Sequence, residues 1–299
     1  MAKRRLLVVV NLHASRAERL IGGAVACLAV HGFDLDIRQS PDRKALADVV
    51  RRCSADVDAI VVAGGDGTVN SAIPALIEAG KPVGILPFGT ANDLALTLDI
   101  PSDPLEAAGV IVAGHLRGID VGKVNDAHFL NVASVGLAVN IAERQDAELK
   151  RQWGVFSYLV ATIDTLSAAQ RFSARISCDG RTERVHAYQI AVGNGVHYGG
   201  GLMVSPDARI DDGLLDIYAI ETDSIANLIA LAPKLRDGTL VDRDDVAFFR
   251  GASVRIETDR PMQVNTDGEV TTSTPAEFSV LPGALQVFAP KPAPRRARA

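Results

Sequence analysis

The sequence is poor in cysteine and contains no long hydrophobic run. Its three cysteines, Cys27, Cys53 and Cys178, lie far apart and lack the spacing of a disulfide framework or a metal site. This usage is typical of a reducing compartment, so a cytoplasmic protein is expected. The apolar run at residues 6–10 is too short for the core of a signal peptide. No stretch approaches the roughly 20 apolar residues of a membrane-spanning helix, so no transmembrane segment is predicted.

An excess of positive charge is also absent. The 299 residues include 31 Lys and Arg against 36 Asp and Glu, which gives a formal net charge of -5. This balance argues against a nucleic-acid partner, because such proteins bind phosphates through an electropositive surface. Basic residues gather at positions 3–5 and 295–298, where they form either solvated tails or contacts with an anionic membrane surface.

The first third of the chain alternates short apolar runs with helical patterns. Strands are expected at residues 4–11, 34–38, 59–62 and 83–86, and helices at residues 17–31, 44–53 and 69–79. Strands that alternate with helices favour a parallel sheet with helices on both faces. We therefore predict an α/β, doubly wound domain over residues 1–121.

The pattern changes after about residue 120, where short strands dominate. Strands are expected at residues 122–124, 128–133, 173–178, 184–192, 214–220, 254–258, 262–264 and 278–280. Asp-Gly pairs at residues 179–180, 212–213 and 267–268 mark turns between them. This part predicts a β-rich, antiparallel sandwich-like domain over residues 122–289. Helices at residues 140–169 and 224–235 interrupt it, and residues 290–299 are expected to form a disordered basic tail.

A glycine-rich turn follows the third predicted strand and precedes a helix. It consists of Gly64, Gly65, Asp66, Gly67 and Thr68. Glycines let the backbone turn sharply and approach a phosphate closely, and the N–H groups of the turn and helix start then face the anion. The run matches neither the Walker nor the Rossmann pattern. It predicts a phosphate-binding turn, with a structural turn as the alternative.

A second loop follows the next strand, at residues 86–93. Thr90 can bond a phosphate, and Asn92 or Asp93 can hold a metal ion or its waters. A simple helix cap is the alternative. Because both loops follow strands of one parallel sheet, they are expected to flank a single crevice at its carboxyl edge.

These two loops, with three later segments, resemble the catalytic domain of diacylglycerol, sphingosine and ceramide kinases and of bacterial lipid kinases. The later segments are residues 192–201, residues 205–216 with Asp-Asp-Gly-Leu, and residues 265–269 with residues 281–285. The resemblance spans almost the whole chain. It implies an ATP- and Mg2+-dependent lipid kinase that acts at the inner membrane face, with its active site in an interdomain cleft. It also implies that the last strand returns to the first domain.

The resemblance carries roles over to individual residues. It implies Asp267 as the proton acceptor, with Glu269 as the second choice and a plain Asp-Gly hairpin as the alternative. It implies a structural magnesium held by Asp212 and by the main-chain carbonyls of Arg209 and Leu214. The expected ligands of the catalytic magnesium are Asp66, Asp93 and Asp120. The expected ATP contacts are Asn11, Ser15, Ser40, Gly64, Gly65, Asp66, Gly67, Thr68, Val69, Asn70, Thr90, Asn92 and Asp93.

Other readings of the sequence stay open. NAD kinases and phosphofructokinases share the Gly-Gly-Asp-Gly run, but they account poorly for residues 87–93 and 207–215. A catalytically silent nucleotide- or lipid-binding regulator is a third alternative. The first loop, at residues 11–15, lacks the proline and glycine of the family pattern, which leaves its shape open. Diacylglycerol, a sphingoid base and phosphatidylglycerol all remain candidate acceptors, and a homodimer is expected as the commonest assembly.

Overall fold

The computed structural model describes residues 4–11, 17–136, 170–198, 202–203, 208–224, 227 and 243–291. The helix expected at residues 140–169 and Ser15 lie outside the described residues, as do most of residues 224–235 and of the tail. None of the helices in the described ranges is long and apolar enough to cross a membrane.

The chain divides into two compact units. The first holds the residues up to Ile119 and those from Gly283 onward, and the second holds Asp120–Pro282. Both boundaries fall inside strands, β5 (Leu116–Val124) and β18 (Ala276–Phe288). The chain therefore enters the second unit along β5 and leaves it along β18.

A parallel sheet forms the centre of the first unit. Its strands are β1 (Arg5–Asn11), β2 (Asp34–Ser40), β3 (Ala59–Gly64) and β4 (Val83–Pro87). Their order is β2-β1-β3-β4, and the end of β18 lies beside β4. Strands β3 and β4 are buried along their whole length, as expected of a sheet covered on both faces. The strand order reverses between β1 and β3, which is where open sheets of this kind bind ligands.

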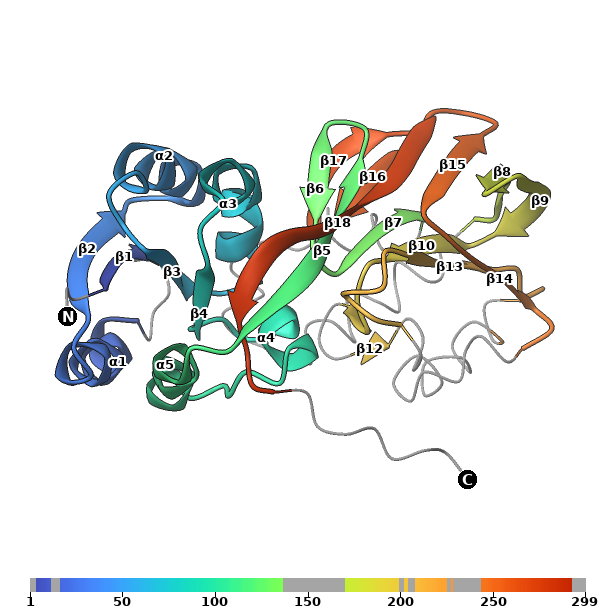
Figure 1. Cartoon of the computed structure of the whole chain (residues 1–299). Helices are drawn as coiled ribbons and strands as arrows, with labels where there is room; N and C mark the ends of the chain where they lie inside the picture. The colour runs from blue at the N-terminus through green and yellow to red at the C-terminus, as the bar shows by residue number, and fades with distance from the viewer. Residues whose placement is uncertain are drawn as a thin grey trace, which may run out of the picture. The chain divides into compact units, whose positions relative to one another are not determined.

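Helices cover both faces of this sheet (Figure 1). On one face lie α1 (Ala17–Val30) and α5 (Pro104–Ala113), which contact each other, and on the other lie α2 (Arg43–Cys53) and α3 (Asp66–Ala79). The predicted doubly wound α/β architecture is confirmed. Helix α5 was not expected, although its Asp103 cap, its Pro104 start and its left-handed Gly114 end are ordinary helix signals.

The second unit contains two antiparallel sheets. One has the order β14-β13-β10-β7-β16-β17. Its strands are β7 (Val132–Gly136), β10 (Gln189–Gly193), β13 (Leu215–Ile220), β14 (Val246–Gly251), β16 (Gln263–Thr266) and β17 (Glu269–Ser273). The other is built from the first half of β18, β15 (Ser253–Thr258), β8 (Phe172–Cys178) and β9 (Arg181–Ala187), and β5 pairs with β6 (Ala127–Phe129). The pair β11 (His197–Tyr198) and β12 (Leu202–Met203) stands apart.

One hydrophobic core joins the two sheets of the second unit. Ile190 and Ile217 of the six-stranded sheet belong to the same buried cluster as Ile176, Val254 and Phe278 of the other. Every second residue of these strands faces this core, which is the pattern of a sandwich. The predicted antiparallel, sandwich-like architecture is confirmed.

Two strands expected as continuous are broken. The stretch at residues 128–133 divides at Leu130 and Asn131 into β6 and β7, and the stretch at residues 184–192 divides at Tyr188 into β9 and β10. In each case the two halves join different sheet neighbours. Strands β14 and β17 were not expected.

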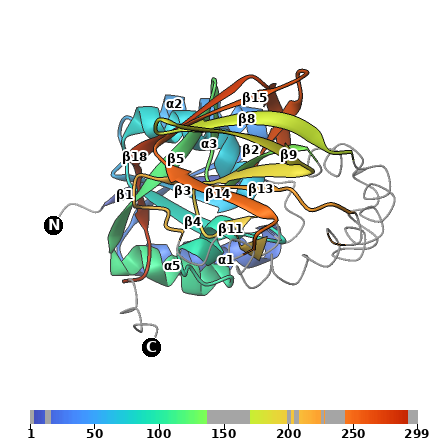
Figure 2. The same cartoon turned by 90° about the vertical axis from the view of Figure 1, so that its right-hand side faces the viewer.

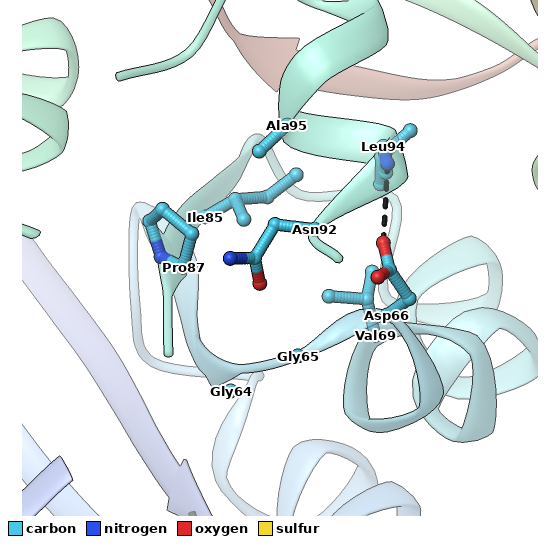
Figure 3. A pocket seen from close by; sticks show the side chains of 9 residues that line it. All are labelled: Gly64, Gly65, Asp66, Val69, Ile85, Pro87, Asn92, Leu94 and Ala95. Carbon is cyan, nitrogen blue, oxygen red and sulfur yellow. Dashed lines mark hydrogen bonds between the residues drawn. The ribbon is translucent and has the colours of Figure 1, made fainter. Parts of the chain in front are cut away.

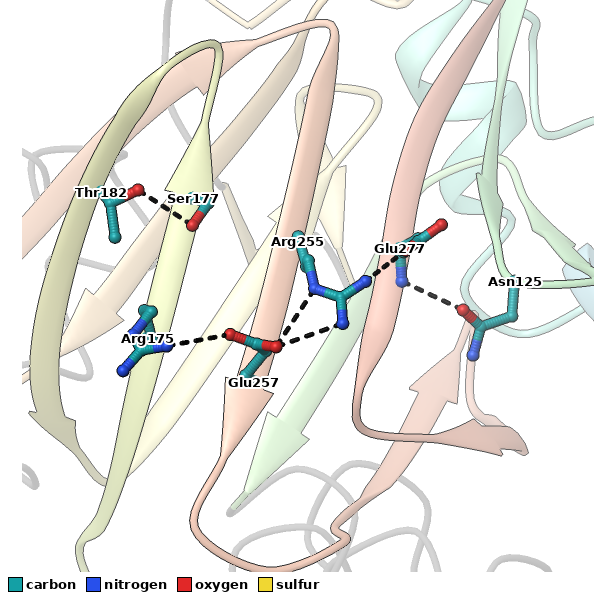
Figure 4. Close-up of polar contacts among 7 residues, drawn as sticks. All are labelled: Asn125, Arg175, Ser177, Thr182, Arg255, Glu257 and Glu277. Atoms are coloured by element: carbon teal, nitrogen blue, oxygen red, sulfur yellow. Dashed lines mark hydrogen bonds and ion pairs between the residues drawn. The ribbon is translucent and has the colours of Figure 1, made fainter.

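The solvent face of β8, β15 and β18 carries a ladder of alternating charges (Figure 4). Arg175 and Arg255 both bond Glu257, at 3.4 Å and 3.1 Å, and Arg255 also bonds Glu277. Residues that alternate with the ladder, such as Ile176 and Ile256, face the core. Exposed pairs of this kind contribute little to stability.

Candidate functional site

The strand register places the predicted loops at one edge of the first sheet. Asn11 at the end of β1 pairs with Ser40 at the end of β2, and Gly64 at the end of β3 pairs with Pro87 at the end of β4. All four parallel strands therefore end together. The loops that follow them meet at the carboxyl edge, where ligands bind in this architecture.

The two glycine-containing loops touch through their backbones. A Cβ atom on Gly65 would lie 2.9 Å from the Cα of Gly89, and a Cβ atom on Gly89 would lie 2.7 Å from the Cα of Gly65. A Cβ atom on Gly64 would lie 2.6 Å from the side chain of Thr68. Glycine is thus required at these positions by the contact itself, independently of any ligand.

A small hollow lies between the two loops (Figure 3). The lining residues are Gly64, Gly65, Asp66, Val69, Ile85, Pro87, Asn92, Leu94 and Ala95. Five of these nine, namely Gly64, Gly65, Asp66, Val69 and Asn92, were expected at an ATP site. The other predicted contacts lie elsewhere along the same edge or outside the described residues.

Asp66 joins the first loop to the helix that follows the second. Its Oδ1 accepts a hydrogen bond from the backbone N–H of Leu94 at 3.1 Å, in the first turn of α4 (Asp93–Thr97). Burial raises the pKa of Asp66, and the nearby charge of Asp93 raises it further, while the backbone N–H groups oppose the shift. Asp93 is also buried. Two neighbouring carboxylates of this kind are a donor set that fits Mg2+.

Asn92 and Thr90 take different roles in the second loop. Asn92 adopts left-handed backbone geometry with φ 52. Its side chain closes the loop on itself, because Oδ1 accepts from the N–H of Gly89 at 2.9 Å and Nδ2 donates to the carbonyl of Gly89 at 3.0 Å. Thr90 lies exposed at the loop tip. Asn92 therefore shapes the loop, and Thr90 is the residue that faces solvent.

The remaining polar residues of this edge are mostly held by protein groups. Asn11 Nδ2 donates to Thr68 Oγ1 at 3.0 Å, and both side chains are buried. Ser40 is fully buried and donates its hydroxyl to the carbonyl of Asp42 at 2.6 Å. Asn70 carries a buried Oδ1 that has no hydrogen-bond partner within the described ranges. Gly67 and Val69 stand in the first turn of α3.

Asp267 lies in the second unit, in a two-residue turn between β16 and β17. Its φ is 47 and that of Gly268 is 94, as expected of an Asp-Gly hairpin. Both carboxylate oxygens also accept backbone hydrogen bonds. Oδ2 accepts from Leu130 at 2.7 Å, and Oδ1 accepts from Asn131 at 3.0 Å and from Val132 at 2.9 Å. The exposed Glu269 begins the next strand. The turn is therefore a hairpin, and its carboxylate is held by a distant segment.

The segment predicted to hold a structural magnesium lies against Asp120. Asp212 Oδ1 accepts from the N–H of Leu214 at 3.0 Å, and Asp120 Oδ2 accepts from the N–H of Gly213 at 2.7 Å. Burial raises the pKa of Asp212, the charges of Asp216 and Asp120 add to the rise, and Arg250 opposes it.

These carboxylates do not amount to a metal centre built from side chains alone. In the part of the chain that the structure describes, no three His, Cys, Asp or Glu side chains gather in a metal-binding arrangement. A magnesium ion at either predicted site would therefore rest on one or two carboxylates, with carbonyl oxygens or waters completing its shell. Arg209, the predicted carbonyl donor, pairs its side chain with Asp211 at 3.0 Å.

Several buried polar residues of the second unit were given no role from the sequence, although three of the four lie in segments that carry the family resemblance. Asp216 forms a two-point ion pair with Arg250, at 2.7 Å and 3.0 Å. Asn131, Asn194 and Asn265 are each at most 5% exposed. Asp216 and these three asparagines are polar residues inside or directly beside apolar strands. That pattern is the sequence signal by which they could have been identified.

Comparison with known proteins gives consistent matches. Residues 5–124 match the family model of the diacylglycerol kinase catalytic domain, and residues 131–289 match that of the YegS C-terminal NAD kinase beta sandwich-like domain. A diacylglycerol kinase of Mycobacterium tuberculosis (strain ATCC 25618 / H37Rv) is 34% identical over 288 residues, which are 92% of this chain and 91% of the relative. A diacylglycerol kinase of Staphylococcus carnosus (strain TM300) is 30% identical over 243 residues, which are 81% of this chain and 79% of the relative.

A solved structure gives the same result. The crystal structure of a diacylglycerol kinase from Bacillus anthracis str. Sterne has a TM-score of 0.79 to this chain. The two are 30% identical, and the match covers 97% of this chain and 98% of the other. At this identity and coverage the similarity extends over both units.

Proposed function

The chain belongs to the diacylglycerol kinase family, and we propose on that basis that it transfers the γ-phosphate of ATP to a hydroxyl of a lipid alcohol such as diacylglycerol. The observation that best supports this proposal is that the two glycine-containing loops follow β3 and β4 and meet at the carboxyl edge of the parallel sheet, where ligands bind in this architecture. Phosphoryl transfer needs mainly positioning and charge neutralisation. Two joined loops rich in backbone N–H groups suit that task.

We assign the phosphates of ATP to the first loop and the start of α3. Gly65 and Gly67 are partly exposed there, whereas Gly64 is buried at the end of β3, and the helix start favours an anion. Thr68, Asn70 and Thr90 are the proposed side-chain donors. Asn11 and Asn92 support the site indirectly, because Asn11 holds Thr68 and Asn92 holds Gly89. Val69 belongs to the wall of the hollow, and contacts from Ser15 and Ser40 stay predictions.

We further propose that Asp66 and Asp93 hold the catalytic Mg2+, with Asp120 as a third candidate. Asp212 and the carbonyls of Arg209 and Leu214 are the proposed ligands of a structural Mg2+. When bound, the catalytic ion would neutralise negative charge on the transferring phosphate. The raised pKa values of Asp66 and Asp212 support both assignments, since a cation would relieve the cost of these partly buried negative charges.

Asp267 is the proposed acceptor of the hydroxyl proton. Three backbone N–H groups bind its carboxylate and fix its orientation, which is what acceptance of a proton from a defined direction requires. Glu269, which is exposed at the start of β17, is the alternative. The lipid would be reached from the water side of a membrane surface, and a homodimer stays a prediction.

The direct test is an acceptor screen with purified protein, Mg2+ and ATP labelled on the γ-phosphate. Lipid arms contain diacylglycerol, a sphingoid base or phosphatidylglycerol in mixed micelles, and soluble arms contain NAD or a sugar phosphate. We expect label in the lipid extract. Label on NAD or sugar phosphate alone would refute lipid kinase activity. NAD is the more informative of the two soluble acceptors, because residues 131–289 match a family model described as NAD kinase beta sandwich-like. Tight ATP binding without transfer would identify a silent regulator.

A matched pair of glycine variants tests the ATP assignment. Gly65→Ala places a methyl group against Gly89, whereas Gly22→Ala in α1 has no atom within 4 Å of the new Cβ. We expect Gly65→Ala to raise the KM for ATP at least roughly tenfold because it separates the loops. The Gly22→Ala protein should behave as the unmodified chain. An unchanged KM for ATP in Gly65→Ala would show that the contact between the two loops does not contribute to ATP binding.

A further inference from the structure

Asn194 is a buried residue that binds the same segment, residues 130–131, as Asp267. It follows β10 directly and is 1% exposed. Its Nδ2 donates to the carbonyl oxygens of Asp120, at 3.0 Å, and of Leu130, at 2.9 Å. Its backbone N–H donates to the carbonyl of Asn131 at 2.9 Å. One residue thus ties the segment at residues 130–131 to β5 and β10.

The bonded carbonyls belong to the same peptide groups that hold Asp267. The carbonyl of Leu130 and the N–H of Asn131 form one peptide group, and the carbonyl of Asn131 and the N–H of Val132 form the next. Asn194 donates to the two carbonyl ends, and the two N–H ends donate to Asp267 Oδ1. Two consecutive peptide groups are therefore clamped between Asn194 and the carboxylate.

We propose that Asn194 is a positioning residue for Asp267, whose side chain acts through the peptide group between Leu130 and Asn131 while its backbone N–H holds the next peptide group. A hydrogen bond to a carbonyl polarises its peptide group and strengthens the bond made by the N–H at the other end. The clamp also fixes the direction of both N–H groups, and hence the orientation of the carboxylate. The inference rests on the proposed role of Asp267 as base, because orientation matters when a proton must be accepted from a defined direction.

A purely structural role for Asn194 makes a different prediction. A structural Asn would lower stability without acting through Asp267. Asn125 supplies the matched control, because its side chain also links distant strands of the second unit. Its Nδ2 donates to Thr272 Oγ1 at 2.9 Å, and its Oδ1 accepts from the N–H of Glu277 at 3.0 Å (Figure 4). The residue has φ 49, so Asn125→Gly removes the side chain without backbone strain.

The test is a double-mutant cycle with the full chain. Asn194→Ala is placed in the unmodified protein and in Asp267→Asn, and kcat and both KM values are measured by lipid phosphorylation. We expect Asn194→Ala to lower kcat roughly 10- to 100-fold with KM values unchanged. In the Asp267→Asn background the same change should lower the residual kcat less than about twofold, because nothing remains to be positioned. Asn125→Gly should leave kcat unchanged.

Equal loss of kcat in both backgrounds, or no loss in either, would overturn the positioning role. Full activity of Asp267→Asn would instead refute the proposed base. Hydrogen exchange at residues 130–132 gives a readout that does not depend on activity, and it should become faster in Asn194→Ala and stay unchanged in Asn125→Gly. If the unmodified protein phosphorylates no lipid, the proposed function fails. Unchanged exchange in Asn194→Ala would then overturn the clamp as well.

Discussion

Two Asp-Gly turns of the second unit have nearly the same local structure and different surroundings. Asp179 and Asp267 have φ values of 44 and 47, and the glycine that follows each lies at φ 87 and 94. Each carboxylate accepts backbone N–H groups from a segment far away in the sequence. Asp179 binds Ala252 at 3.1 Å and Ser253 at 3.3 Å, where β14 turns into β15.

What separates the two turns is the segment that each one binds. Asp267 accepts hydrogen bonds from the three N–H groups at the break between β6 and β7, and Asn194 donates hydrogen bonds to carbonyl oxygens of the same segment. Asp179 lies at the end of the β8–β9 hairpin, whose solvent face carries exposed ion pairs. The turn itself is thus common to both places, and the difference between them lies in the tertiary contacts.

The largest expected effect comes from neutralising each aspartate. Asp267→Asn should lower kcat by at least roughly 1,000-fold, because it removes the proposed base. Asp179→Asn makes the same chemical change in the same kind of turn and should leave kcat within about twofold. Lipid phosphorylation and thermal melting of both variants make the comparison. Similar losses of activity in the two variants would show that the turns differ less than proposed.

A carboxylate of the first unit extends the comparison. Asp66 also accepts a backbone N–H from a later segment, but burial raises its pKa. A carboxyl group with a raised folded-state pKa favours folding at low pH and loses that contribution as pH rises through the raised value. Asp66→Asn should therefore keep or raise the melting temperature at pH 7 without Mg2+, and the difference should vanish below about pH 4.

The same variant should lose activity. If Asp66 holds the catalytic Mg2+, Asp66→Asn should lower kcat roughly 100-fold or more at saturating ATP. Melting curves from pH 4 to 8, with kinetics at several Mg2+ concentrations, test both parts. Lower stability of Asp66→Asn at pH 7 would contradict the inference that the charged Asp66 carboxylate destabilises the fold. A normal dependence of its activity on Mg2+ would show that Asp66 does not bind the catalytic ion.

The glycines of the two turns separate backbone strain from function. Gly180→Ala and Gly268→Ala both force a positive φ on alanine, with no atom within 4 Å of either new Cβ. Each should cost about 1 kcal/mol, or roughly 2–4 °C in Tm. Activity should fall in Gly268→Ala because the turn carries Asp267. A comparable fall in Gly180→Ala, measured at a temperature where both proteins are folded, would contradict the distinction.

The smallest expected effect concerns the ladder near the Asp179 turn. Arg255→Gln removes the contacts with Glu257 and Glu277 (Figure 4). Because the Arg255 side chain is 45% exposed, the substitution should lower the free energy of unfolding by less than about 1 kcal/mol and leave kcat unchanged. Denaturant unfolding in low and high salt measures it. A large, salt-independent loss would show that this face is a docking or packing surface.

Much of the fold was predictable from local patterns. The alternation of strands and helices in the first third gave the doubly wound sheet, and the Asp-Gly signals gave the hairpins at residues 179–180 and 267–268. The breaks at Leu130 and Tyr188 were not predictable, because apolar, strand-favouring residues stand on both sides of each break. Figure 1 labels β6, β7, β9 and β10 as separate strands, and Figure 2 shows β9 beside β8. Those breaks arise where the chain passes from one sheet to the next.

The sequence by itself determined the turn types, the strand periodicity and the glycines that the loops need. These features depend on backbone sterics and on neighbours a few residues away. Tertiary structure decided that Gly65 meets Gly89, that Asp66 binds the helix after the second loop, and that Asp267 binds a strand break while Asp179 does not. Those partners lie 24 to 137 residues apart, from Gly65 and Gly89 (89 − 65) to Leu130 and Asp267 (267 − 130). Only strand pairing and sheet packing bring them within hydrogen-bond distance.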